Sequence, residues 1–160
     1  NFILFSIAQI CILSYYNCDI GPSPFERFYL GSDGLSGFAL DGREIIALRG
    51  YNNNTITPSI NGNTVGGTAY NKYTMELRFP VSLNPSATIY TLAFIEAGNN
   101  WLGTRNFNPF NIKRSAGIGV RIFLPMFGLL GLDWGYGIDE IENKPNVNKG
   151  QFHFTIGQQF

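Results

Sequence analysis

The sequence predicts an all-β fold, in the form of an antiparallel transmembrane β-barrel segment with one long loop that folds inward. Three observations predict it. Large apolar and aromatic residues alternate with small or polar ones, the alternating runs are about ten residues long, and turns rich in Gly, Pro and Asn separate them. A tilted strand of about ten residues is long enough to cross a bilayer in a barrel. An apolar face opposite a polar face is the lipid-out, polar-in pattern of such barrels.

We expect six strands, and the parity of each run indicates its two faces. The last run is the clearest, because Phe152, Phe154 and Ile156 share one face. The alternation does not show which face Glu96 lies on, because Glu96 is two residues from Phe94 and so shares a face with a large apolar residue. The first run is apolar on both faces. In chain order the runs are about residues 2–16, 73–79, 90–98, 114–124, 130–138 and 151–160.

The predicted connections between strands are unequal in length. Short turns are expected at residues 81–87 and 125–128, and medium loops at 99–112 and 139–150. One very long loop covers about residues 17–68, and loops beyond about 15 residues are usually functional or disordered. No Pro/Ser-rich linker divides the chain. We therefore expect one partial barrel domain over residues 1–160 and no second domain.

The composition argues against several classes of protein. Charged residues make up 14% of the 160 residues, and 11 basic residues balance 11 acidic ones. Nucleic-acid binding requires a basic surface, so we expect no nucleic-acid partner. No apolar run approaches the roughly 18 to 20 residues of a transmembrane helix. The chain also begins at Asn1 without a methionine, which predicts that it is the end of something longer.

The sequence contains no pattern that indicates chemistry. Cys11 and Cys18 would lie about 23 Å apart in one strand, too far for a disulfide, so we expect both to be unpaired. No Cys/His cluster indicates a metal. His153 is the only histidine, and without a Ser or Asp at a useful spacing we expect no catalytic residue. We therefore predict a protein that is not an enzyme and has no cofactor.

One group of residues in the long loop suggests a clamp. Arg49 lies in the segment Leu48-Arg49-Gly50-Tyr51, and two later strands each carry a carboxylate in an apolar setting, Glu76 and Glu96. Arginine presents a planar fork of donors that matches carboxylate geometry. We therefore define Arg49, Gly50, Tyr51, Glu76 and Glu96 as a candidate loop-tip clamp that would hold the loop in a defined place.

Two architectures remain open at this point. A soluble β-sandwich also alternates apolar and polar residues, although with shorter strands. A membrane barrel needs about eight strands or more to close. Unpaired strand edges in lipid leave backbone groups without hydrogen-bond partners. Six strands would therefore need the rest of a barrel, or partner copies, to be stable in a membrane.

Six groups of residues stand out along the chain. They are 24–31 (PFERFYLG), 48–51 (LRGY), 66–67 with 75–80 (GG and MELRFP), 94–101 (FIEAGNNW), 114–120 followed by Pro125 (RSAGIGV), and 157–160 (GQQF). In this order they resemble the BamA family of outer-membrane β-barrel assembly factors, over essentially the whole chain. Leu48 and Tyr51 are conservative variants of the family's loop-tip motif, Ser32 replaces a frequent glycine, and Glu96 stands where many members have Asp.

The resemblance implies both an architecture and a location. It implies that the chain supplies about the last six strands of a 16-strand barrel in the outer membrane of a Gram-negative bacterium. It implies that the long loop passes back into the lumen and places Arg49 against Glu76 and Glu96, so that Glu96 points inward. Ten further strands and periplasmic POTRA domains are absent from this sequence.

The resemblance also implies a function. Family members fold and insert β-barrel proteins through a seam, next to the terminal strand, that opens sideways. The implied partners are outer-membrane lipid, the rest of the barrel, POTRA domains, nascent outer-membrane proteins and accessory subunits of the assembly complex. The implied seam residues are Gln151, Phe152, Phe154, Ile156, Gly157 and Phe160.

Two other functions remain as alternatives. One is a two-partner-secretion or autotransporter-assembly pore of the same superfamily, which would differ in its N-terminal domains. The other, from a different class, is a soluble β-sandwich adhesin.

Overall fold

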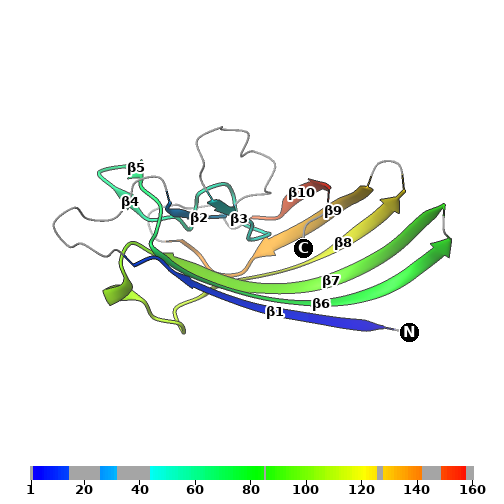
Figure 1. The fold of residues 1–160 in the computed structure, drawn as a ribbon, viewed down its shortest axis with the longest axis horizontal. Helices are drawn as coiled ribbons and strands as arrows, with labels where there is room; N and C mark the ends of the chain where they lie inside the picture. The colour runs from blue at the N-terminus through cyan, green and yellow to red at the C-terminus, as the bar shows by residue number, and fades with distance from the viewer. Residues whose placement is uncertain are drawn as a thin grey trace.

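Six strands form a single antiparallel sheet in the computed structural model, which describes residues 2–14, 26–31, 44–84, 86–125, 128–141 and 149–157. The order is β1-β6-β7-β8-β9-β10, so β1 and β10 are the two edges of an open, curved sheet (Figure 1). The prediction of an all-β antiparallel fold with six strands in the sheet is confirmed. The strands are β1 (Ile3–Ile12), β6 (Ala69–Asn84), β7 (Ala87–Trp101), β8 (Lys113–Leu124), β9 (Gly128–Gly137) and β10 (Gln151–Ile156).

Several predicted strand ends are wrong. The turn expected at residues 81–87 is mostly strand, because β6 continues to Asn84 and β7 begins at Ala87. Pro80 has no N–H for a ladder hydrogen bond, and the pairing register shifts between Pro80 and Ser82, which is how a bulge accommodates proline within a strand. The first strand ends at Ile12 and the last at Ile156. Phe160 lies outside the described residues.

The two faces of the sheet have opposite chemistry. Large apolar side chains on one face are exposed, including Met75 (51%), Ile95 (59%) and Ile118 (63%). Charged side chains on the other face are buried, including Glu96 (1%) and Asp133 (1%). This arrangement is the reverse of a soluble domain and matches a barrel wall with lipid outside. In the described residues no second sheet of comparable size covers the apolar face, so the β-sandwich alternative does not fit.

The long loop between β1 and β6 contains four short strands that the sequence analysis did not predict. They are β2 (Phe28–Leu30), which pairs in parallel with β3 (Glu44–Ile46), and the hairpin of β4 (Ser59–Ile60) and β5 (Asn63–Thr64). These segments lie over the concave side of the sheet (Figure 1). Strands of two or three residues are too short to show an alternating pattern, which is why the period missed them.

The apolar core lies between this loop and the inner face of the sheet. Phe28, Leu30, Leu48 and Tyr51 are buried there together with Tyr70 of β6. The rings of Phe28 and Tyr70 are 4.7 Å apart in an edge-to-face arrangement, which is a favourable geometry for aromatic pairs. The loop is therefore packed against the sheet, and this packing brings residues 48–51 to the polar inner face.

Two smaller predictions concern helices and thiols. No helix in the described part of the chain is long and apolar enough to cross a membrane. Cys11 on β1 is a free, half-buried thiol. Cys18 lies outside the described residues, so the prediction that it is unpaired stays a prediction.

Ile118→Arg tests whether the exposed apolar face of the sheet contacts lipid. Ile118 lies mid-strand on the exposed apolar face of β8, where an arginine in lipid is expected to destabilise the barrel by about 2–4 kcal/mol. The measurement is the denaturant midpoint of the full-length protein refolded in lipid vesicles. Ser59→Arg, on the exposed hairpin strand β4, is the matched control and is expected to have little effect. Equal midpoints for both variants would contradict a lipid-facing position for Ile118.

Candidate functional site

The register of β6 and β7 brings two distant carboxylates together. Glu76 lies directly opposite Phe94, and Glu96 lies directly opposite Thr74. Glu76 and Glu96 are therefore diagonal neighbours on the same face of the sheet, a separation that long side chains can bridge. Both side chains are buried on the inner face. A single cation placed above these strands can contact both carboxylates at once.

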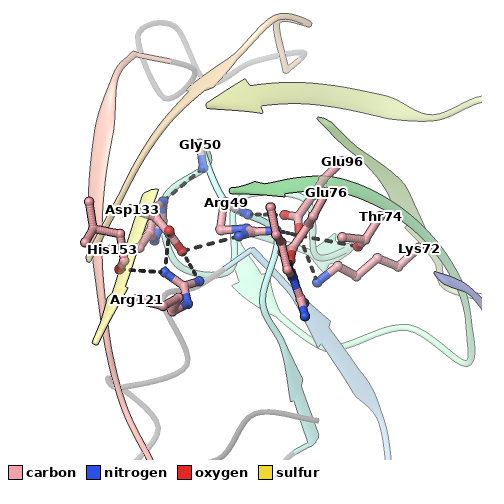
Figure 2. A network of polar contacts seen from close by, with 11 residues as sticks. Arg49, Gly50, Lys72, Thr74, Glu76, Glu96, Arg121, Asp133 and His153 are labelled. Atoms are coloured by element: carbon pink, nitrogen blue, oxygen red, sulfur yellow. Dashed lines mark hydrogen bonds and ion pairs between the residues drawn. The ribbon is translucent and has the colours of Figure 1, made fainter. Parts of the chain in front are cut away.

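Arg49 is that cation. One terminal nitrogen of its guanidinium group lies 2.7 Å from Glu76 Oε1 and 2.7 Å from Glu96 Oε1. The backbone N–H of Arg49 donates a further hydrogen bond of 2.8 Å to Glu96 Oε2. Figure 2 shows these contacts converging below the loop. Glu96 therefore holds both the side chain and the backbone of the loop tip.

The stacking of Arg49 on Phe94 explains the ambiguous period of β7. The guanidinium carbon lies 3.7 Å from the centre of the Phe94 ring, within cation–π distance. Phe94 and Glu96 are both buried on the inner face. An aromatic and an acidic residue share one face because each contacts a different part of the same arginine. Glu96 thus points inward, as the resemblance implied.

Asp133 and Arg121 extend the network to β9 and β8, and the sequence analysis did not find them. Asp133 on β9 lies 3.3 Å from a guanidinium nitrogen of Arg49. Arg121 on β8 forms two parallel hydrogen bonds of 2.6 Å to Asp133. One pattern could have indicated Asp133, because it has the parity of Gly131 and Gly135 and so lies among the small residues of its run.

The remaining contacts give each carboxylate more than one donor. Lys72 Nζ lies 3.4 Å from Glu96 Oε1, and Thr74 Oγ1 donates to the same oxygen at 3.3 Å. Arg78 donates two hydrogen bonds to Glu76 Oε2. Removing one partner of such a buried pair typically costs about 3–5 kcal/mol, because the other charge is left without compensation. The network therefore fixes the loop tip strongly.

The loop-tip arginine and tyrosine keep their protons in this environment. Burial disfavours the charged form of Arg49, but the attraction of Glu96 and the neighbouring carboxylates outweighs it and raises the pKa above its ordinary value. Burial raises the pKa of Tyr51 to about 12. The Tyr51 hydroxyl therefore remains a donor, and it donates to the backbone oxygen of Arg114 at 2.7 Å.

Gly50 packs against the backbone of β9, next to Gly135 and Gly137. Its φ of 89° is in the left-handed region that favours glycine. A Cβ on Gly135 would lie 2.8 Å from the Gly50 nitrogen, and a Cβ on Gly137 would lie 2.8 Å from the Gly50 oxygen. The glycines of β9 thus let the loop backbone approach the strand. The Gly50 N–H donates to Nε2 of His153 at 2.9 Å.

The candidate seam residues lie on the terminal strand and mostly face away from the network. Phe152, Phe154 and Ile156 are exposed on the apolar face, whereas Gln151 is half-buried. Gly157 follows the strand with a φ of 103°. Phe160 is outside the described residues. Within the described residues β10 pairs only with β9, so its other edge is open.

The described residues provide no group of three or more His, Cys, Asp or Glu that could hold a metal ion. The acidic residues of the network are instead compensated by arginine and lysine. The buried ion pairs of this network hold the loop tip on the inner face of the sheet.

Gly135→Ala tests the close approach of the loop tip. The added methyl group would meet the Gly50 backbone, and such overpacking typically costs about 1–3 kcal/mol. We expect faster proteolysis of the loop around Arg49 and a lower unfolding midpoint in lipid. Gly103→Ala is the control, because its φ of −146° suits any residue and no atom lies within 4 Å of the new methyl. Identical loop proteolysis in both variants would contradict the close approach.

The comparisons with known proteins give one result at the level of the family. No match was found among curated proteins. The model of the Omp85 superfamily domain matches residues 7–160, nearly the whole chain. Members of this superfamily are outer-membrane proteins of Gram-negative bacteria and organelles that serve protein assembly or secretion. The match covers the long loop and all of the six-stranded sheet except the first residues of β1, and the chain therefore belongs to the Omp85 superfamily.

Proposed function

We propose that this chain is the C-terminal part of a BamA-type assembly factor in the outer membrane of a Gram-negative bacterium. In this role it folds and inserts other β-barrel proteins into the membrane. The observation that carries the proposal is the buried network around Arg49, which fixes the tip of the long loop on the inner wall of the sheet. A fixed loop gives the polar interior a defined shape, while the edge at β10 remains free to pair with a strand of another protein.

We further propose that the barrel opens sideways at the seam next to the terminal strand β10. β10 is a sheet edge of six residues, and a short edge strand is held by few ladder hydrogen bonds. Open edges can add a strand from another chain by backbone pairing. In the proposed mechanism a nascent barrel strand pairs with this edge. The apolar residues Phe152, Phe154 and Ile156 face the lipid that the substrate enters.

The proposed activity involves no chemical reaction and no cofactor. Folding of the substrate and a locally thinned bilayer supply the energy. The proposed partners are nascent outer-membrane proteins, the remaining strands of the barrel, POTRA domains and accessory subunits of an assembly complex. A secretion pore of the same superfamily would share the clamp but would move an unfolded chain across the membrane instead of inserting a barrel.

Arg49→Ala tests the role of the clamp in assembly. Loss of the guanidinium leaves Glu76 and Glu96 with fewer partners, and we expect the loop tip to detach and assembly to slow at least tenfold. The measurement is the rate at which the full-length protein in proteoliposomes inserts a small outer-membrane barrel. Arg49→Lys is the matched control. It keeps the charge but loses the planar fork, so we expect an intermediate rate.

Two outcomes would contradict the proposal in different ways. An unchanged insertion rate in Arg49→Ala, together with a protease-sensitive loop, would mean that assembly does not need the clamp. A wild-type protein that transports a secreted chain but inserts no barrel would favour the secretion pore.

Closing the seam covalently tests lateral opening. A cysteine at Gln151 cross-linked to a cysteine in the first strand of the barrel is expected to stop insertion, because β10 can then no longer release its edge. Reduction of the disulfide is expected to restore the rate. Full activity in the oxidised protein would show that insertion does not use this edge. The control is the single cysteine variant, which cannot form the cross-link.

A further inference from the structure

His153 connects the loop tip to the terminal strand. The Gly50 N–H of the loop donates to Nε2 of His153 at 2.9 Å, and both residues are buried. His153 lies on β10, the edge strand, whereas most of the clamp contacts are made by β6 and β7. This bond is therefore a direct contact between the clamp and the strand at the proposed seam.

The direction of the hydrogen bond determines what residue 153 must provide. A backbone N–H can only donate, so Nε2 must present its lone pair, and the proton of the neutral ring is on Nδ1. A side chain without an acceptor at this position would leave the buried Gly50 N–H without its partner in the described structure. Burying an unpaired donor is costly. The contact therefore depends on acceptor chemistry and not only on the size of the side chain.

On the side of the loop tip that faces β10, the contacting side chains come from the adjacent strands β9 and β10. His153 lies directly opposite Asp133 in the pairing of β10 with β9. Asp133 bonds Arg49, and Arg121 bonds Asp133 from β8. The charged groups facing His153 from the neighbouring elements are thus Arg49, Arg121 and Asp133. Figure 2 shows His153, Asp133 and Arg121 on one side of Arg49, and Glu76 and Glu96 on the other.

A cavity also joins the same two segments. Its volume is about 300 Å³, and it is lined by Tyr51, Asn52 and Asn53 of the loop and by Gln151, Phe152 and His153 of β10. The loop and the start of the terminal strand therefore face each other around His153, with space into which either segment can move. This arrangement allows a displacement of the loop tip to reach β10 without passing through β6 and β7.

We propose that His153 is a positioning residue that couples the loop tip to the terminal strand, so that release of the loop loosens β10 from β9. The inference rests on the proposed function for its meaning, because β10 is the edge that would accept a substrate strand. The coupling itself is a property of the folded protein without substrate. It predicts that a change at Arg49 is detected at β10 only when residue 153 can accept the Gly50 hydrogen bond.

Hydrogen exchange of the full-length protein in lipid nanodiscs tests this coupling. Amide exchange is followed in two peptides, one containing Gly50 and one covering Gln151–Ile156. His153→Leu is expected to speed exchange in both by roughly five-fold, the effect of losing one hydrogen bond. His153→Gln carries a carbonyl acceptor and is expected to restore slow exchange. Thr155→Val is the control, an inward-facing buried position on the same strand.

A double-mutant cycle with Arg49→Ala separates coupling from a general loss of stability. We expect Arg49→Ala to speed β10 exchange in the wild-type background and to add little in His153→Leu, because the connection is already broken. Three results would each overturn the proposal: additive effects of the two substitutions on β10, unchanged exchange at Gly50 in His153→Leu, or equally fast exchange in His153→Gln.

The outcome does not depend on the assembly assay. Exchange is measured without substrate, so a protein that inserts no barrel can still show the coupling. A protein with additive exchange effects that inserts barrels normally would refute the coupling and leave the proposed function standing.

Discussion

The buried guanidinium of Arg49 is the interaction on which the inner side of this structure depends. It bonds Glu76 on β6, Glu96 on β7 and Asp133 on β9, so one loop residue contacts three strands. A charge removed from water is stable only among compensating partners, and each of these carboxylates has a second cation beside it. The loop therefore has one favourable position on the sheet, and its backbone is fixed there together with the side chain.

The sheet can accept the loop because its two faces differ in size as well as in polarity. The outer face carries the large apolar residues. The inner face has glycine wherever the loop backbone or a bent side chain must approach, as at Gly135 below Gly50 and at Gly119 beside Asp133. The same alternation that makes the outer face suitable for lipid thus makes room for the charged network inside.

Much of the fold was predictable because a strand that separates lipid from a polar interior must alternate at every residue. This period identified the six long strands and their faces. It did not give their ends, since a turn was expected at residues 81–87, where β6 continues past a bulge to Asn84. Nor did it find β2 to β5, which are too short to show a period. β2 is held by a tertiary contact that the local sequence does not reveal, since the Asn100 side chain on β7 donates a hydrogen bond of 2.7 Å to the backbone oxygen of Phe28.

The sequence by itself determined the strand pattern, and the chemistry of arginine and carboxylates made Arg49, Glu76 and Glu96 a candidate group. The resemblance to a known family implied that the loop tip lies in the lumen. Only the tertiary structure added Asp133, Arg121 and His153. Parity assigns each of them to the face opposite the large apolar residues, but it does not say which side chains each one meets there. The role of each arises from the order β8-β9-β10 and the pairing register, which place it beside the loop. The alternation within one strand gives its two faces, but it does not give the side chains that neighbouring strands and the loop bring beside it, and those neighbours decide the role of these three residues.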